Sequence, residues 1–141
     1  MSDDLYNDAI VREAKAGAHA ARLPHPDRTV TRDNPLCGDR VTLDLRLEDG
    51  HVAEVGQKVR GCLLTQAAAA LLARRGIGAT PQEAERIIGE VRSLLRGEAS
   101  ALSWDELAMF RPVAGIKSRH ECVLLPFEAL AEALAEGGPA G

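Results

Sequence analysis

Apolar and polar residues alternate from Val41 to Leu47, where every second residue is valine or leucine. A period of two with one polar side is typical of a half-buried strand in an antiparallel sheet. The Asp49-Gly50 pair that follows is a strong hairpin signal, and residues 52–59 supply the returning strand. Residues 29–33 are expected to add a third strand. This part of the chain therefore predicts a small antiparallel sheet.

Helical patterns dominate the rest of the chain. Alanines and leucines after Cys62 end in Arg74-Arg75-Gly76, which places cations and then a glycine at a helix C-terminus. Thr80-Pro81-Gln82-Glu83 and Ser103-Trp104-Asp105-Glu106 both read as capping boxes that begin helices. The expected helices cover residues 3–17, the segment from Leu63 to Gly76, the segment from Pro81 to Leu95, a short stretch that ends before Pro112, and residues 124–135.

Strands before helices, together with a length of 141 residues, predict an α+β class. We expect a single domain over residues 1–141, with a small antiparallel three-stranded sheet packed against about five helices. Within it, residues 1–22 form an N-terminal helix and linker, and residues 136–141 form a frayed tail.

Composition and charge narrow the function classes. The net charge of −4 and the lack of a dense Lys/Arg block argue against nucleic-acid binding. The longest apolar run, residues 67–73, is too short to span a membrane, and the acidic N-terminus lacks the features of a signal peptide. The expected location is therefore cytoplasmic. Three cysteines in such a reducing compartment will not form a disulfide framework, so they are structural, reactive or metal-bound.

The first cysteine lies in Asn34-Pro35-Leu36-Cys37-Gly38-Asp39, directly before the alternating strand. In extended backbone, residues two apart point the same way, so the Cys37 thiol and the Asp39 carboxylate can address one point. Gly38 between them lets a ligand approach the backbone. A thiolate and a carboxylate together suit Zn²⁺ or iron. The same residues are also typical of a turn around a buried cysteine, and this fragment leaves both interpretations open.

The other two cysteines are expected at helix starts. Cys62 opens the alanine-rich helix and Cys122 the last one, where the helix dipole lowers the pKa of a thiol. Pro126 supports the second assignment, because proline fits best in a first turn. His120 and Glu121 are possible further ligands or proton relays. The competing interpretation is that both cysteines are simply core residues.

Three motifs occur in order along the chain: Asn34-Pro35-x-Cys37-Gly38-Asp39, then Gly61-Cys62, then Arg119-x-x-Cys122. This combination resembles the U-type iron–sulphur cluster assembly proteins, the IscU/SufU/NifU N-terminal family. The resemblance runs from Leu5 to about Leu134 and is strongest to the SufU branch, because the segment between the last two cysteines is long.

Two positions depart from the family pattern. Glu121 stands where the family usually has His or Lys, which makes the site more negative. The serines that usually follow the Gly-Cys pair are replaced by Thr65 and alanines, a change expected to affect packing more than metal ligation.

The resemblance implies a SufE/IscU-like fold and a metal site on Cys37, Asp39, Cys62 and Cys122, with the three cysteines as cluster ligands. Cys37 and Cys122 are the candidate sulphur acceptors, and Arg119 accompanies them as a catalytic candidate. From the polarity of their surroundings, we expect Cys37 to be the most accessible thiol, Cys122 to be intermediate and Cys62 to be packed inward.

The expected function is iron–sulphur cluster assembly. The protein would accept sulphur from a cysteine desulfurase of the SufS/IscS type, hold zinc, iron or a transient [2Fe–2S] cluster, and serve a downstream iron–sulphur carrier or apo-proteins. Two alternatives use the same ligands: a zinc-dependent sulphur-transfer partner that never carries a cluster, and a structural zinc module that regulates the desulfurase. In each case it would act as a scaffold or acceptor rather than a stand-alone enzyme, as a monomer or weak dimer with no nucleic acid and no membrane.

Overall fold

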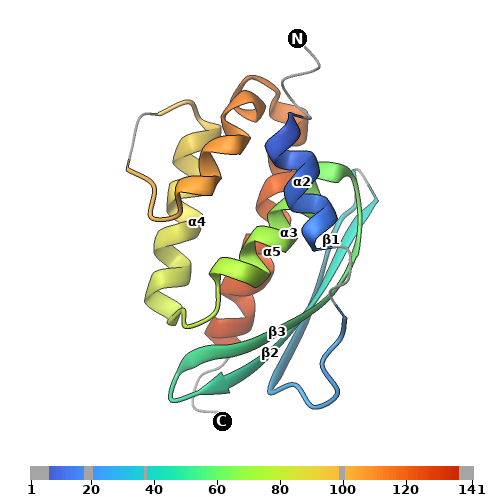
Figure 1. The fold of residues 1–141 in the computed structure, drawn as a ribbon, viewed down its shortest axis with the longest axis vertical. Helices are drawn as coiled ribbons and strands as arrows, with labels where there is room; N and C mark the ends of the chain where they lie inside the picture. The colour runs from blue at the N-terminus through green and yellow to red at the C-terminus, as the bar shows by residue number, and fades with distance from the viewer. Residues whose placement is uncertain (1–6, 18–20, 37, 99–100, 137–141) are drawn as a thin grey trace.

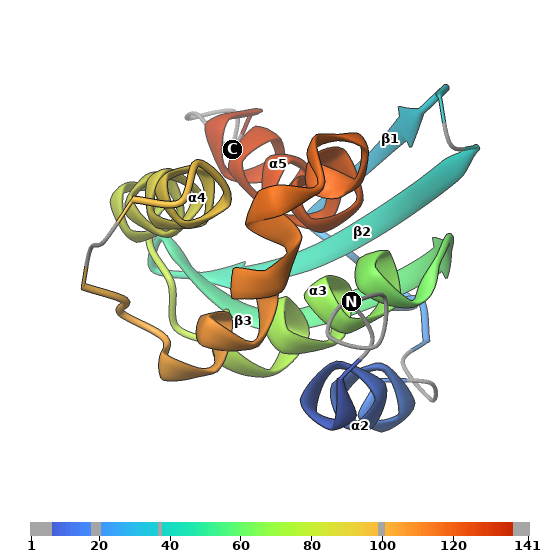
Figure 2. The ribbon, with the colours of Figure 1, turned by 90° about the horizontal axis from the view of Figure 1, so that it is seen from above.

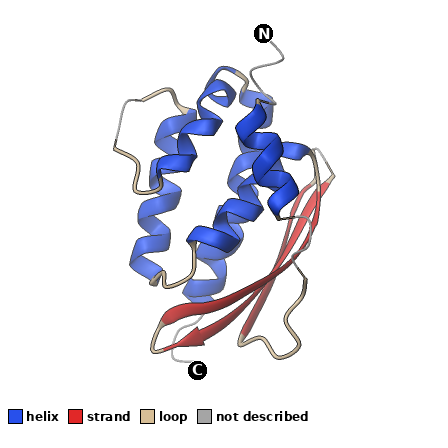
Figure 3. Ribbon diagram, viewed as in Figure 1, coloured by secondary structure: helices blue, strands red, loops and turns tan. Residues whose placement is uncertain are grey.

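The computed structural model describes residues 7–17, 21–36, 38–98 and 101–136. A three-stranded antiparallel sheet lies on one side of the molecule and the helices on the other (Figures 1 and 3), so the predicted α+β class is confirmed. In chain order the elements are α2 (Asp8–Ala16), β1 (Arg28–Asn34), β2 (Asp39–Glu48), β3 (His51–Arg60), α3 (Leu63–Arg75), α4 (Pro81–Leu95), the 3₁₀ segments η1 (Asp105–Gly115) and η2 (Lys117–Arg119), and α5 (His120–Glu136).

The sheet has the order β1-β2-β3, and its register follows the alternation in the sequence. Val41, Leu43 and Leu45 of β2 are fully buried, because the strand turns these side chains toward the helices. The β2–β3 turn has positive φ at both Asp49 and Gly50, as its Asp-Gly sequence favours. The predicted hairpin is therefore confirmed.

Helices α3 and α5 pack on the sheet, while α2 lies against α3 and α4 against α5 (Figure 2). The core between them is mainly aliphatic, with Phe110 and Phe127 as its largest fully buried side chains. Among the described helices, none is long and apolar enough to cross a bilayer.

The outer face of the sheet carries one buried charge. Asp44 is fully buried, and its carboxylate accepts hydrogen bonds from the Arg22 guanidinium, the Thr29 hydroxyl and the Leu23 backbone N–H. The segment that holds Arg22 and Leu23 thereby ties the N-terminal part of the chain to the middle strand. Gly56 lies opposite Asp44 in the sheet and gives this segment room to pass.

The helix α4 begins where the sequence predicted, because its capping residues lie within one turn of one another. The Thr80 hydroxyl accepts from the Glu83 N–H and the Glu83 carboxylate accepts from the Thr80 N–H, so the predicted capping box at α4 is confirmed. Helix α2 begins at Asp8 with Asn7 as its N-cap, later than the predicted start at residue 3; residues 3–6 lie outside the described residues.

Two predicted boundaries are wrong. The Ser103 side chain caps no helix; its N–H and hydroxyl donate to the Glu90 carboxylate, and the segment that follows is a 3₁₀ helix that runs through Pro112 to Gly115. The last helix begins at His120 rather than Leu124, so Pro126 lies inside it and not in its first turn. In both segments buried apolar neighbours, such as Phe110 and Phe127, outweigh the local preference of proline.

Candidate metal centre

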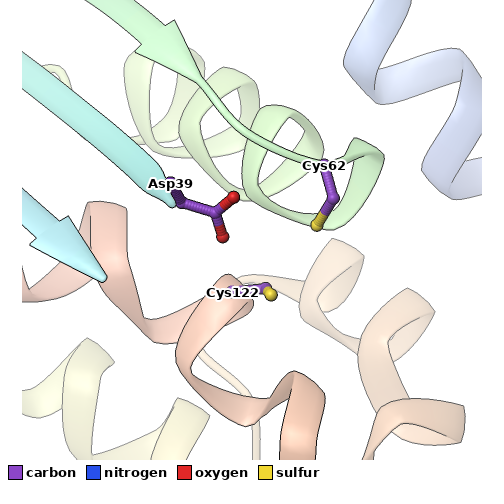
Figure 4. Close-up of side chains that lie close together, drawn as sticks. All are labelled: Asp39, Cys62 and Cys122. Carbon is purple, nitrogen blue, oxygen red and sulfur yellow. The ribbon is translucent and has the colours of Figure 1, made fainter. Parts of the chain in front are cut away.

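Asp39, Cys62 and Cys122 meet at one end of the sheet, although they are far apart in the sequence (Figure 4). One ligand atom from each of them, a carboxylate oxygen and two sulphurs, lies within 4.8 Å of the other two. Of the described residues, these form the only group of three or more His, Cys, Asp or Glu side chains with this geometry.

Asp39 is brought to the site by strand pairing. It is the first residue of β2, is paired with Asn34 of β1, and is 4% exposed. The next pair across β2 and β3 is Arg40 with Arg60, so Gly61 continues past Asp39 at the sheet edge. A Cβ atom on Gly61 would stand 3.0 Å from Oδ1 of Asp39, so a larger residue here would have to push the carboxylate aside by a few tenths of an ångström.

Cys62 is the N-cap residue of α3, as the sequence predicted for a helix start. Its backbone is extended (φ −71°, ψ 174°), and its side chain makes no capping hydrogen bond to the helix. The sulphur instead lies 3.6 Å from the Thr65 hydroxyl oxygen and beside Asp39 and Cys122. The thiol is therefore directed at the site and not at the free N–H groups of its own helix.

Cys122 lies in the first turn of α5, two residues after the helix begins at His120. Its side chain is fully buried, whereas Cys62 is half-buried. This reverses the predicted order of exposure, in which Cys62 was the inward thiol. The reason is tertiary: α5 lies between α3, α4 and the sheet, so even its first turn is covered.

The pKa of the Cys122 thiol is raised well above its ordinary value. Burial is the largest cause, and the neighbouring Cys62 and Asp39 add to it. The expectation that a helix start would acidify this thiol is therefore wrong in the metal-free protein, because burial and two neighbouring acidic groups outweigh the helix dipole. A cation bound beside Cys122 would favour its thiolate form.

The donor set fits a zinc or ferrous ion. Thiolates and carboxylates are ligands of both, with bonds of about 2.3 Å from zinc to sulphur and about 2.0–2.2 Å to oxygen. Tetrahedral bonds of that length put neighbouring ligand atoms about 3.5–4 Å apart, so atoms within 4.8 Å need to move by about 1 Å at most. Asp39, Cys62 and Cys122 would supply three of the four ligands.

Cys37 lies outside the described residues, so its predicted role as a ligand is untested. Its neighbours form a turn: the Gly38 N–H donates to the Asn34 carbonyl, and the Leu36 N–H donates to the Asn34 side chain. Gly38 has a φ of +74°, which rules out the extended backbone that the i, i+2 argument assumed. Leu36, directly before Cys37 in the sequence, is 92% exposed.

His120 and Glu121, two further candidates, are not part of the converging group of Asp39, Cys62 and Cys122. The His120 ring is hydrogen-bonded to the carbonyls of Val113 and Ala114, which joins η1 to α5 and uses Nε2. Glu121 is exposed. The pKa of Glu128 is raised mainly by the burial of its own carboxyl and next by the negative charge of Glu121. Arg119 is half-buried in η2, three residues before Cys122.

One residue of the site was missed at the sequence level. Thr65 is fully buried, and its hydroxyl donates to Oδ2 of Asp39 at 3.2 Å while lying against Cys62. The sequence led us to expect that this position affects packing more than metal ligation, and the hydrogen bond from Thr65 to the Asp39 carboxylate was not predicted. Its spacing was a usable signal, because a residue three positions after an N-cap faces the cap.

Comparison with protein families finds that residues 5–124 match the NifU-like N-terminal domain. The chain belongs to this family. The match spans all three motifs, from the Asn34-to-Asp39 turn to Cys122, and the family resemblance found in the sequence is thereby confirmed.

Comparisons with individual proteins also find relatives of this family. The chain is 31% identical to the iron–sulphur cluster assembly scaffold protein IscU of Thermotoga maritima, over 92% of each chain. It is 24% identical to the zinc-dependent sulfurtransferase SufU of Bacillus subtilis, over 96% of this chain and 95% of that one. Among solved structures, a NifU-like protein (N-terminal) from Brucella abortus superposes with a TM-score of 0.89 at 31% identity, over 99% of both chains. The SufU protein of Fervidobacterium islandicum has the same fold, with a TM-score of 0.87 at 24% identity, over 95% of this chain and 99% of that one.

Proposed function

We propose that this protein assembles iron–sulphur clusters on a site made of Cys37, Asp39, Cys62 and Cys122. The observation that carries the proposal is the convergence of Asp39, Cys62 and Cys122 within 4.8 Å in a chain of the NifU-like family. Cys37 is the proposed fourth ligand, because it is the remaining cysteine of the family motifs and lies two residues before Asp39 in the sequence. The iron or the nascent [2Fe–2S] cluster is cargo, whereas zinc would be a resident ion.

The proposed sulphur donor is a cysteine desulfurase that carries a persulphide. A thiolate of this protein attacks the terminal sulphur of that persulphide, a new S–S bond forms, and the desulfurase cysteine leaves as a thiolate. No net electrons are exchanged in this step. To become the sulphide of a cluster for a downstream carrier or apo-protein, the transferred sulphur would have to take up two electrons from an external reductant.

Cys37 is the proposed acceptor. Cys122 is fully buried and Cys62 is half-buried, so a partner reaches both only with difficulty. The residues on either side of Cys37, Leu36 and Gly38, are exposed. Access controls the rate of thiol–persulphide exchange, so the ranking becomes Cys37 first, Cys62 second and Cys122 last.

A second candidate function is zinc-dependent sulphur transfer without any cluster. It is favoured by the relation to the Bacillus subtilis protein, whose name describes that activity, over nearly the whole chain. The same ligands would hold zinc, and Cys37 would leave the metal to accept sulphur.

Metal analysis and sulphur mapping separate the two functions. Protein purified anaerobically without added metal is analysed for zinc and iron, then incubated with desulfurase and cysteine, either alone for sulphur mapping or with ferrous iron and a reductant for cluster formation. Peptide mass spectrometry locates the added sulphur, and visible absorption reports a cluster. Cluster formation supports the assembly function, whereas tightly held zinc with persulphide on Cys37 and no cluster supports the second candidate.

Cys37→Ser and Cys62→Ser serve as a matched pair in this experiment. Each removes one proposed ligand, but only Cys37→Ser removes the proposed acceptor. Loss of persulphide in both variants alike, or sulphur on Cys122 in the wild-type protein, would contradict the assignment of Cys37. A wild-type protein that binds neither metal nor sulphur would contradict both functions.

A further inference from the structure

Thr65 lies between two of the three converging ligands. Its hydroxyl oxygen is 3.2 Å from Oδ2 of Asp39 and 3.6 Å from the sulphur of Cys62, and its side chain has no exposed surface. We propose that Thr65 is a positioning residue of the metal centre, whose hydroxyl holds the Asp39 carboxylate in the orientation in which it ligates the metal. This inference rests on the proposed function, because it presumes that Asp39 is a ligand.

The direction of the hydrogen bonds follows from their chemistry. A hydroxyl has one proton to donate, and a carboxylate can only accept, so Thr65 donates to Asp39. The remaining lone pairs of the hydroxyl can accept the S–H of Cys62. If Cys62 binds a metal as a thiolate and its proton goes to solvent, the Thr65 hydroxyl can still donate to Asp39, since that hydrogen bond does not use the Cys62 proton.

The Thr65 hydroxyl is also directed away from its own helix. Threonine in a helix commonly bonds the carbonyl three or four residues earlier. Here the Gly61 carbonyl, four residues earlier, accepts from the Gln66 side chain at 2.9 Å, and the Thr65 hydroxyl reaches a carboxylate 26 positions away. The Gly61 carbonyl is thus less available as an acceptor for the Thr65 hydroxyl. The hydrogen bond from Thr65 to Asp39 instead joins the start of α3 to the start of β2.

Close packing restricts the carboxylate from a second side. A Cβ atom on Gly61 would lie 3.0 Å from Oδ1 of Asp39 and 3.1 Å from Cβ of Thr65. The Gly61 backbone and Thr65 thus confine Asp39, one by contact and the other by a hydrogen bond. Partners that orient a metal ligand in this way contribute about 10–100-fold to metal affinity in other proteins.

The chain offers a matched control for removal of this hydroxyl. Thr29 also donates its hydroxyl to a buried carboxylate, that of Asp44, at 2.6 Å, and Asp44 is not part of the metal centre. Thr29→Val therefore removes the same kind of hydrogen bond elsewhere. Thr65→Val removes the hydroxyl with little change in volume, Thr65→Ala removes it without placing a second methyl group against Asp39, and Thr65→Ser restores it.

The test measures zinc affinity by competition with a chromophoric chelator and the absorption spectrum of the Co²⁺-loaded protein. We expect Thr65→Val and Thr65→Ala to weaken zinc binding about 10–100-fold, and Thr65→Ser to stay within about threefold of wild type. The Co²⁺ spectrum should shift in the ligand-field bands while the thiolate charge-transfer intensity is retained, since the sulphurs remain bound. Thr29→Val should lower thermal stability and leave both metal readouts unchanged.

A double-mutant cycle tests whether Thr65 acts through Asp39. In an Asp39→Ala background, Thr65→Val should cause no further loss of zinc affinity, because the carboxylate to be positioned is gone. An equal loss in both backgrounds would overturn the inference, and so would wild-type affinity in Thr65→Val. If the wild-type protein binds neither zinc nor cobalt, the proposed function itself fails and the inference with it, whereas normal wild-type binding that is insensitive to Thr65 refutes the inference alone.

Discussion

Gly61 packs against the carboxylate of Asp39 with no room between them for another carbon atom. The Cβ atom of any other residue at position 61 would lie 3.0 Å from Oδ1 and 3.1 Å from Cγ of Asp39, closer than nearly all contacts that real Cβ atoms make. A side chain at position 61 is therefore disfavoured by contact with Asp39 and not by the backbone, since the φ of Gly61 is not in the left-handed region.

Gly61→Ala is therefore expected to displace Asp39 and to weaken zinc binding about tenfold. Overpacking should also lower the free energy of unfolding by about 1–3 kcal/mol. Chelator competition and thermal or urea unfolding measure the two effects. Gly89→Ala is the control, because Gly89 lies within α4 and a Cβ atom added there would meet nothing within 4 Å. That change should stabilise the fold by about 0.5–1 kcal/mol and leave zinc affinity unaltered. Equal affinities in the two variants would contradict the packing argument.

Asp44 is expected to make the fold sensitive to acid. Burial raises the pKa of its carboxyl, but hydrogen bonds from Arg22, Thr29 and the Leu23 N–H outweigh burial, so the pKa lies below its ordinary value of 3.8. Because the pKa of Asp44 is lower in the folded than in the unfolded state, its carboxylate stabilises the fold at pH values above the unfolded-state pKa of 3.8. That contribution is lost as the pH falls from 3.8 toward the folded-state pKa.

Asp44→Asn should cost about 1.5–3 kcal/mol of unfolding free energy near pH 7, as for other hydrogen bonds to a charged group. The difference from wild type should narrow as the pH falls below 3.8, and urea unfolding across this range measures it. Asp33→Asn removes a surface ion pair with Arg40 and serves as the control, with a much smaller loss at pH 7. A difference between Asp44→Asn and wild type that stays constant with pH would show that Asp44 is not the titrating group.

Metal removal is expected to lower the melting temperature without unfolding the chain. A ligand present at a hundred times its dissociation constant stabilises the native state by about 2.7 kcal/mol, which corresponds to roughly 5–10 °C in a domain of this size. Cys122 belongs to the core formed by the sheet, α3, α4 and α5, but most of that core consists of aliphatic residues away from the site, so the far-ultraviolet circular dichroism should be retained. Calorimetry with and without chelator gives the shift, and an identical melting curve for both samples would mean that no metal is bound.

The thiols of Cys62 and Cys122 should differ in reactivity in the metal-free protein. Cys122 is fully buried and its pKa is well above the ordinary value, while Cys62 is half-buried at the start of α3. The thiolate is the reactive form, so iodoacetamide should modify Cys62 at least about tenfold faster. Timed labelling with peptide mass spectrometry measures both rates, and unfolded protein in urea, where the two rates should converge, is the control. Faster labelling of Cys122 in the folded protein would contradict the burial described here.

Local chemistry in the sequence determined much of the fold. The alternation from Val41 to Leu47 and the Asp-Gly turn need only neighbouring residues to specify a hairpin, and the Thr80–Glu83 capping box closes within one helical turn. The helix-start position of Cys62 is likewise local. The three motifs identified the family, because their order and residue types are carried by the sequence itself.

The environment of each site residue was decided only by the tertiary structure. Cys62 and Cys122 both stand at helix starts, yet α5 is covered on several sides and α3 is open at its first residue, so their exposures are the reverse of what their neighbours in sequence suggested. The same long-range packing carries α5 through Pro126. The contact of Thr65 with Asp39 spans 26 positions and depends on how β2 meets α3. Burial and hydrogen-bond partners of this kind arise from segments that meet only after folding, and local propensity contains no information about them.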